Sequence, residues 1–284
     1  MKLRWIAAAT LGARLAHAQA APDDSALWDA VVEPHGPALA HTLAVARRAL
    51  DASAARPTPA LREAYAQLVQ ARRLAPDHAG VLAVLGEVAD ELGQTADAVE
   101  ALEACVRLTG PDRASHRVIA QLGAIALRRG RLDDAVRWLR HTQGPAFEPV
   151  RVRAVIHLAT ALAARGEMAE ALDLLVRSTA SRGAAGAPDP PIALLLALAV
   201  HYDRDEQPAA VFATVDWLRA TLQRELAPAL GRAMGEIAFA PAEDRYYYRA
   251  LVYELAGSYL EARAEWLLYA ATDGAAWRAR ALAH

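Results

Sequence analysis

The chain has 284 residues, of which 55% are hydrophobic but only 6% aromatic, so alanine and leucine supply most of the apolar surface. Both residues favour helix, and this length is ample for a packed core. The formal net charge is -2, without a long block of like charge, and Cys105 is the single cysteine. These features argue against a nucleic-acid-binding arm, an intramolecular disulfide framework and a four-cysteine metal site.

Residues 1–20 have the layout of a secretory signal peptide. Lys2 and Arg4 precede an apolar stretch, which ends in small residues of the A-x-A type between Ala16 and Ala20. We therefore expect this segment to direct export. Arg14 interrupts the apolar stretch and keeps an alternative open, in which these residues form the first amphipathic helix of a cytoplasmic protein.

Three consecutive segments, 79–110, 116–143 and 152–180, repeat the same pattern with an offset of about 36 to 37 residues. Several positions recur in all three copies. The equivalent residues are Leu85-Gly86, Leu122-Gly123 and Leu158-Ala159; Gly93, Gly130 and Gly166; and Ala98, Ala135 and Ala171.

Each copy is predicted to be two amphipathic helices that break at the middle glycine, because apolar residues recur at three- and four-residue spacing. In the first copy, Gly86 and Ala98 lack bulk where the two helices cross, so the backbones can approach closely. Gly93 can adopt the left-handed conformation that ends the first helix. The same pattern makes Cys105 a buried core residue and not a reactive thiol.

The repeated positions resemble the tetratricopeptide repeat, whose signature contains Leu-Gly in the first helix, a turn glycine, and an alanine in the second helix. Leu85, Gly86, Gly93 and Ala98 match, whereas Ala89 replaces an aromatic residue. The resemblance implies an all-α fold, a right-handed superhelical α-solenoid of antiparallel helix pairs with about six repeats plus a capping helix. It also implies a protein-binding role.

The predicted organisation follows these copies along the chain. Residues 21–180 form an N-terminal repeat lobe, and residues 181–191, with two glycines and three prolines, form a linker. Residues 192–284 form a C-terminal repeat lobe. Within it we expect an irregular insertion at 227–243 and a capping helix at 277–283.

The two copies in the C-terminal lobe differ in quality. The copy at 246–269 is the most typical of the family. The copy at 192–220 has Glu206 in place of the turn glycine and Val211 in place of the alanine, so its helix packing is expected to be irregular.

A binding surface is expected on the concave side of the array, which the first helices of the pairs line in this family. A mixture of polar and apolar side chains there suits an extended peptide or a partner helix. The alternative is that many of these side chains are merely solvated. The register of the family implies these groove-facing positions: Glu87, Asp90, Arg117, Leu127, Arg153, Ile156, His157, Thr160, Asp203, Asp244, Tyr247 and Glu254.

The run Tyr246-Tyr247-Tyr248 points in three directions from one helix, so at least one ring is expected to be exposed as an interface anchor. The alternative is that all three rings fill the seam with the preceding insertion. Glu243 and Asp244 lie beside this run and argue against single-stranded nucleic acid as the ligand.

No catalytic or cofactor-binding motif stands out. The nine histidines fall in no His-x-x-x-His spacing, and the sequence lacks a phosphate-binding loop and a nucleophile elbow. We therefore predict no metal, cofactor, enzyme activity or membrane-spanning segment. The predicted function is a protein- or peptide-binding scaffold or adaptor of a bacterial cell envelope complex, periplasmic or secreted. The alternative is a cytoplasmic regulatory sensor whose array binds a signalling peptide or effector.

Overall fold

The computed structural model describes residues 35–52, 59–142, 149–180, 191–222, 225–237, 239 and 241–284, and these residues contain helices and turns but no strand. The all-α prediction is therefore confirmed. The predicted signal peptide and residues 181–190 of the predicted linker lie outside the described residues. The α-helices are α2 (Gly36–Ala52), α3 (Pro59–Leu74), α4 (Ala79–Glu91), α5 (Thr95–Thr109), α6 (His116–Arg128), α7 (Leu132–Leu139), α8 (Pro149–Ala164), α9 (Met168–Ala180), α10 (Ile192–Arg204), α11 (Pro208–Leu222), α12 (Leu226–Glu236), α13 (Asp244–Leu255), α14 (Tyr259–Ala271) and α15 (Arg278–Ala283).

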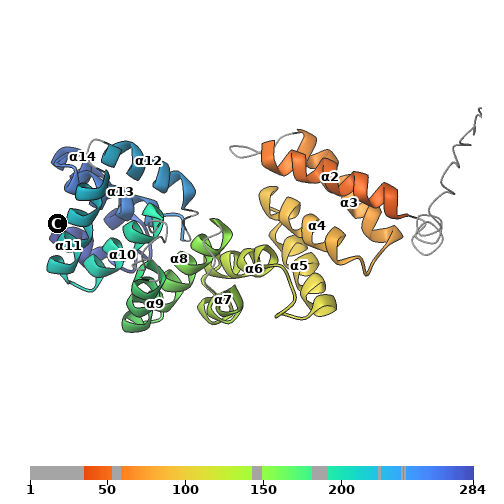
Figure 1. Cartoon of the computed structure of the whole chain (residues 1–284), viewed down its shortest axis with the longest axis horizontal. Helices are drawn as coiled ribbons and strands as arrows, with labels where there is room; N and C mark the ends of the chain where they lie inside the picture. Colours follow the sequence, from red (N-terminus) through yellow and green to blue (C-terminus); the bar gives the residue numbers. More distant parts are fainter. Residues whose placement is uncertain are drawn as a thin grey trace, which may run out of the picture.

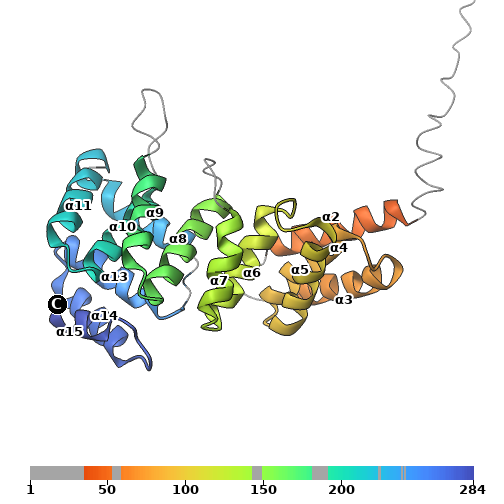
Figure 2. The ribbon, with the colours of Figure 1, turned by 90° about the horizontal axis from the view of Figure 1, so that it is seen from below.

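Neighbouring helices pack in pairs: α2 with α3, α4 with α5, α6 with α7, α8 with α9, α10 with α11, and α13 with α14. The pairs from α2–α3 to α10–α11 follow one another along the longest axis of the molecule, and α13–α14 lies at the same end as α10–α11 (Figure 1). The first helices of successive pairs also touch, since α4 packs on α6, α6 on α8, α8 on α10 and α10 on α13. Figure 2 shows the last pair and α15 at the far end of this row.

The two helices of a pair approach very closely where the sequence places small residues. A Cβ added at Gly86 would lie 2.4 Å from Cγ of Leu102, and one added at Gly123 would lie 2.4 Å from Cγ of Leu139. Ala98, which faces this crossing from α5, has no exposed surface. The predicted steric role of these residues is confirmed, because no side chain fits at either glycine without displacing a buried leucine.

The turn between the two helices keeps one conformation in most pairs. Gly93 has a φ of 75° and Gly257 a φ of 78°, as predicted for a glycine that ends the first helix. The copy at 192–220 keeps this turn although it lacks the glycine, since Glu206 has a φ of 55°. Its main chain closes in the same way: the N–H of Gln207 donates to the carbonyl of Tyr202 at 2.9 Å, as that of Gln94 donates to Ala89 at 2.8 Å.

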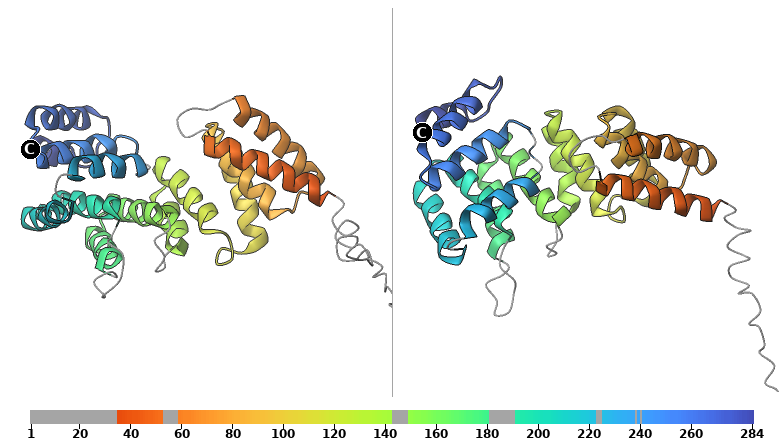
Figure 3. Two further views of the ribbon diagram at one scale, coloured as in Figure 1. Left: turned by 45° about the horizontal axis from the view of Figure 1, so that its top comes forward. Right: turned by 90° about the horizontal axis from the view of Figure 1, so that it is seen from above.

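A single cluster of buried apolar residues runs from Ala126 to Ala281. It includes residues on both sides of the predicted linker, and α9 packs directly on α10. The predicted insertion forms α12, which packs against α10, α11 and α13. In the left view of Figure 3, the blue helices that follow this insertion lie beside the teal α10 and α11.

We expect Gly86→Ala to lower the free energy of unfolding by about 1 to 3 kcal/mol, because the new methyl group would overlap Leu102. Gly235→Ala is the matched control. Gly235 is also helical, but an added Cβ meets nothing within 4 Å, so this variant should be stabler by about 0.5 to 1 kcal/mol. Urea unfolding followed by circular dichroism measures both free energies of unfolding. If the two variants changed this free energy in the same direction, the close crossing at Gly86 would be contradicted.

Glu206→Gly should raise the free energy of unfolding by about 0.5 to 1 kcal/mol, since glycine relieves the left-handed strain at this turn. Glu206→Ala removes the same carboxylate but keeps a Cβ, so it should give no such gain. Thermal unfolding of the two variants separates backbone strain from loss of charge. A gain in the alanine variant would show that the side chain, and not φ, is responsible.

Candidate functional site

The predicted groove residues on α4 and α6 form ion pairs across the two helices. Arg117 Nε lies 2.8 Å from Oε2 of Glu87, and the Arg117 side chain is 53% exposed. Asp90 accepts hydrogen bonds from Arg128, at 2.5 Å, and from Gln121. Burial raises the pKa of Glu87, although Arg117 acts in the opposite direction. Arg117 therefore presents a cationic head at this part of the array.

The predicted groove residues on α8 lie mostly in the core. His157 and Thr160 are buried, and the Thr160 hydroxyl donates to the carbonyl of Ile156 at 2.9 Å. Ile156 itself is buried, as is Leu127 on α6. Arg153 is the exposed one of the predicted groove residues on α8.

The remaining predicted residues, Asp203, Asp244, Tyr247 and Glu254, come together at the far end of the array. Asp203 and Asp244 are buried despite their charge, and Tyr247 has no exposed surface. Among the three neighbouring tyrosines, Tyr248 is also buried and Tyr246 is half-buried. The Tyr248 ring packs edge-on against Phe239, with ring centroids 5.2 Å apart, so it fills the seam with the insertion.

Asp203 is the centre of a polar cluster that joins α10, α13 and α15. Its carboxylate accepts a hydrogen bond from the Tyr247 hydroxyl at 2.6 Å and from Arg280 at 2.7 Å. The Nε2 atom of His284 lies 3.1 Å from Oδ2 of the same carboxylate. Three groups from two other segments thus converge on one buried carboxylate.

Glu254 forms the second acidic position of this cluster. Its carboxylate accepts a hydrogen bond from Nε1 of Trp266 at 3.0 Å and lies 2.9 Å from Nδ1 of His284. The imidazole of His284 also stacks on the Trp266 indole, with ring centroids 4.2 Å apart and planes 12° apart. We call Asp203, Tyr247, Glu254, Trp266, Arg280 and His284 the α15 cluster.

A buried ion pair lies behind the α15 cluster. Arg204 donates to Oδ1 of Asp244 at 2.8 Å, and their side chains are 1% and 6% exposed. The guanidinium carbon of Arg204 lies 4.6 Å from the centre of the Tyr247 ring and 5.6 Å from that of Trp277. Burial opposes the charge of Arg204, yet Asp244 raises its pKa, so the guanidinium is a permanent cation here.

Sequence reasoning found the acidic half of the α15 cluster but missed Arg204, Arg280 and His284. The available signal was the end of α10, where Asp203 and Arg204 follow a long apolar run. Adjacent opposite charges at the end of a buried helix indicate that each has a specific partner. Their partners are 40 and 77 residues away in the sequence, and local patterns do not connect them.

The polar contacts of the α15 cluster shift the pKa values of Asp203 and His284. Burial opposes the charge of Asp203, but hydrogen bonds from His284, Arg280 and Tyr247 lower its pKa to about 2. Burial also opposes the charge of His284, but its hydrogen bonds to Asp203 and Glu254 raise its pKa to about 9. His284 is therefore charged at neutral pH.

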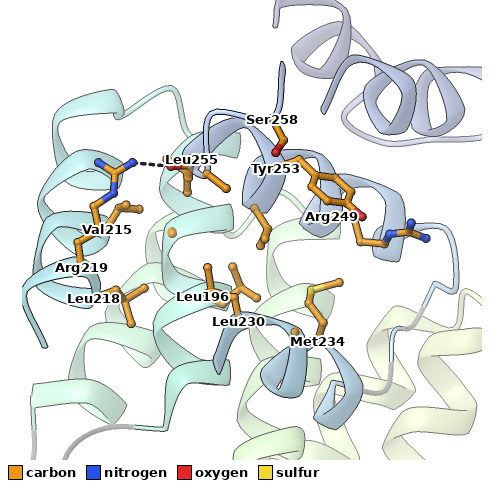
Figure 4. Close-up of a pocket in the computed structure, with 14 residues that line it drawn as sticks. Leu196, Val215, Leu218, Arg219, Leu230, Met234, Arg249, Tyr253, Leu255 and Ser258 are labelled. Atoms are coloured by element: carbon orange, nitrogen blue, oxygen red, sulfur yellow. Dashed lines mark hydrogen bonds between the residues drawn. The ribbon is translucent and has the colours of Figure 1, made fainter. Parts of the chain in front are cut away.

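A second feature of the same end is an apolar pocket of about 660 Å³ between α10, α11, α12 and α13 (Figure 4). Leu196 comes from α10, Leu218 from α11, and Leu230 and Met234 from α12. Tyr253 on α13 supplies an aromatic wall. The sequence did not predict this pocket, because it depends on where α12 packs.

The described residues hold no group of three or more His, Cys, Asp or Glu side chains placed to bind a metal ion. Across the described helices, none combines the length and hydropathy that a membrane span requires. Cys105 is a free, buried thiol, and burial raises its pKa.

The pH dependence of α15 docking should follow His284. The pKa of His284 is about 9 in the folded protein, against an ordinary value of 6.5. The contacts of His284 therefore stabilise the docked α15 fully below pH 6.5, and this stabilisation is lost as pH rises through 9. The contacts of Asp203 contribute fully to the stability of the folded protein above pH 3.8, and this contribution is lost as pH falls through about 2. Titration of His284 by NMR should therefore give a midpoint near 9.

Asp203→Asn should bring the His284 midpoint down toward 6.5, because it removes one of the two carboxylates. The protection of the α15 amides against hydrogen exchange, relative to the intrinsic exchange rate at each pH, should also fall above pH 9 in the wild type. His41→Ala, an exposed histidine on α2, is the control and should leave both measurements unchanged. A midpoint that stays near 6.5 in the wild type would contradict the α15 cluster.

No family model matches the sequence, and no curated protein matches it. The tetratricopeptide resemblance therefore rests on the repeated residues themselves.

Proposed function

We propose that this chain is a non-enzymatic scaffold or adaptor of the tetratricopeptide type, which binds a short helical segment of a partner protein on the face formed by α10 and α13. The proposal rests on one observation, the docking of α15. This short helix packs on α14, and Arg280 and the following His284 reach Asp203 and Glu254, which are positions that the repeat register assigns to the groove.

The contacts of α15 are of the kind that a peptide ligand makes. α15 has only six residues, and an isolated helix of that length is unstable in water. It is held by charged hydrogen bonds from Arg280 and His284 and by the stacking of His284 on Trp266. We infer that the same face holds a partner helix that presents a cationic and an aromatic group at similar spacing.

The rest of the array supports a scaffold. The pairs α4–α5 and α6–α7 share one close crossing, and the three pairs from α4 to α9 share one turn. Such a row offers an extended surface to partners. We propose a right-handed superhelical arrangement of about six repeats for this row. Arg117 and Arg153, both exposed, are the groove residues that we expect to contact a partner outside the α15 cluster.

A location in the cell envelope remains part of the proposal and rests on residues 1–20 alone. N-terminal sequencing of the protein purified from cells tests it directly. A mature chain that starts near Ala20 supports export, whereas a chain that retains Met1 favours the cytoplasmic alternative.

Binding of a peptide in trans tests the proposed function. The probe is a fluorescein-labelled peptide with the sequence of residues 275–284, and the double variant Arg280→Ala/His284→Ala loosens the chain's own α15. In the wild type, the chain's own α15 covers the binding face in most molecules and so competes with the peptide. The double variant should therefore bind the peptide at least about tenfold more tightly than the wild type. Fluorescence anisotropy measures both dissociation constants.

Two controls make this experiment decisive. A peptide with glutamate in place of Arg280 and His284 should not bind, since the face is acidic. Asp203→Asn in the background of the double variant should weaken binding of the original peptide. If the double variant keeps its helical circular dichroism but binds the two peptides equally or not at all, the α10–α13 face is not a helix-binding site.

A further inference from the structure

The pocket between α10 and α13 lies apart from the α15 cluster and shares none of its residues. Its volume of about 660 Å³ falls in the range of small-molecule sites. It exists because the regular stacking changes at this point. In the earlier pairs the second helix packs on the next first helix, as α9 does on α10, whereas after α11 the extra helix α12 packs between α11 and α13.

Small and flexible side chains keep the pocket open on the α12 side. Gly231 lines it, and an added Cβ there would meet no atom within 4 Å. Met234, from the same helix, adapts its shape readily to a ligand. Leu196, Leu218 and Leu230 form the remaining apolar walls, and Figure 4 shows these side chains around one shared space.

The polar groups of the pocket are few and are hydrogen-bond donors. Arg219 and Ser258 lie at one edge, beside Leu255 (Figure 4). Arg219 donates to the carbonyl of Leu255 and lies 3.6 Å from Asp216, but its side chain is 47% exposed and guanidinium has five N–H donors. Arg249, the other charged lining residue, is paired with Glu265 at 2.6 Å, and no carboxylate lines the pocket.

We infer that this pocket binds a single-chain amphiphile with an anionic head, such as a long-chain carboxylate, with its tail among Leu196, Leu230 and Met234 and its head at Arg219. An alkyl tail needs no hydrogen-bond partner, which suits these walls. A peptide segment placed there would bury main-chain amides against helices whose own amides are already paired, and that is unfavourable. The charge of Arg219 favours an anionic head over a neutral one.

Isothermal titration of the full-length chain with decanoate, dodecanoate and tetradecanoate tests the inference. Each added methylene should tighten binding about three- to fourfold until the pocket is full. Gly231→Phe places a ring in the pocket and should weaken dodecanoate binding at least about tenfold. Gly235→Phe is the matched control, because Gly235 is on the same helix with equal free space but does not line the pocket.

Arg219→Met tests the head group separately. This variant should lose the preference for dodecanoate over dodecanol while it still binds dodecanol, because the tail site is intact. The inference is overturned if no carboxylate binds saturably, if both glycine variants lose binding equally, or if a model amphipathic helix binds the pocket and dodecanoate does not. None of these outcomes affects binding of the α15 peptide, so this inference and the proposed function fail independently.

Discussion

The close crossing of the two helices in the pairs α4–α5 and α6–α7 is the constraint on which the regular part of the array depends. At Gly86 and Gly123 the backbone of the first helix meets a leucine of the second with no room for a methyl group. Leu102 and Leu139 are therefore locked between the two helices and fully buried. Because these two pairs are interlocked in this way, their remaining apolar side chains face the next pair, and stacking continues along the chain.

The insertion changes this stacking once, and the apolar pocket at the far end lies next to it. α12 packs against α10, α11 and α13, and the pocket lies among these four helices. On another side of α10 and α13, Asp203 and Glu254 face α15. A carboxylate as buried as Asp203 requires hydrogen-bond donors, and it receives them from Tyr247, Arg280 and His284. Docking of α15 and ionisation of Asp203 are thus linked, because each favours the other.

Local rules were enough to predict the helices, the left-handed turn at Gly93 and the steric role of Gly86, since each depends on neighbours in the sequence or on one helix crossing. They were not enough for His157, which the repeat register placed among the groove-facing positions but which is buried. Its burial depends on how α8 packs against adjacent helices. Tyr247 was correctly placed on the first helix of its pair, but its ring packs edge-on against Trp266 and Tyr269 of α14, which are distant in sequence. Tertiary contacts between weakly patterned segments carry no local signal.

The charges beneath α15 indicate which partner its face can accept. Arg204 and Asp244 neutralise each other inside the protein, and this pair fixes α13 on α10 while contributing little net charge. Asp203 and Glu254 differ, because the cations that balance them, Arg280 and His284, both come from the last segment. When that segment leaves, two carboxylates beside the Trp266 indole lose their cations. A cationic helix would restore the balance, whereas an acidic helix would add repulsion to the loss of hydration, so the proposed helix partner would be selected by charge as well as by shape.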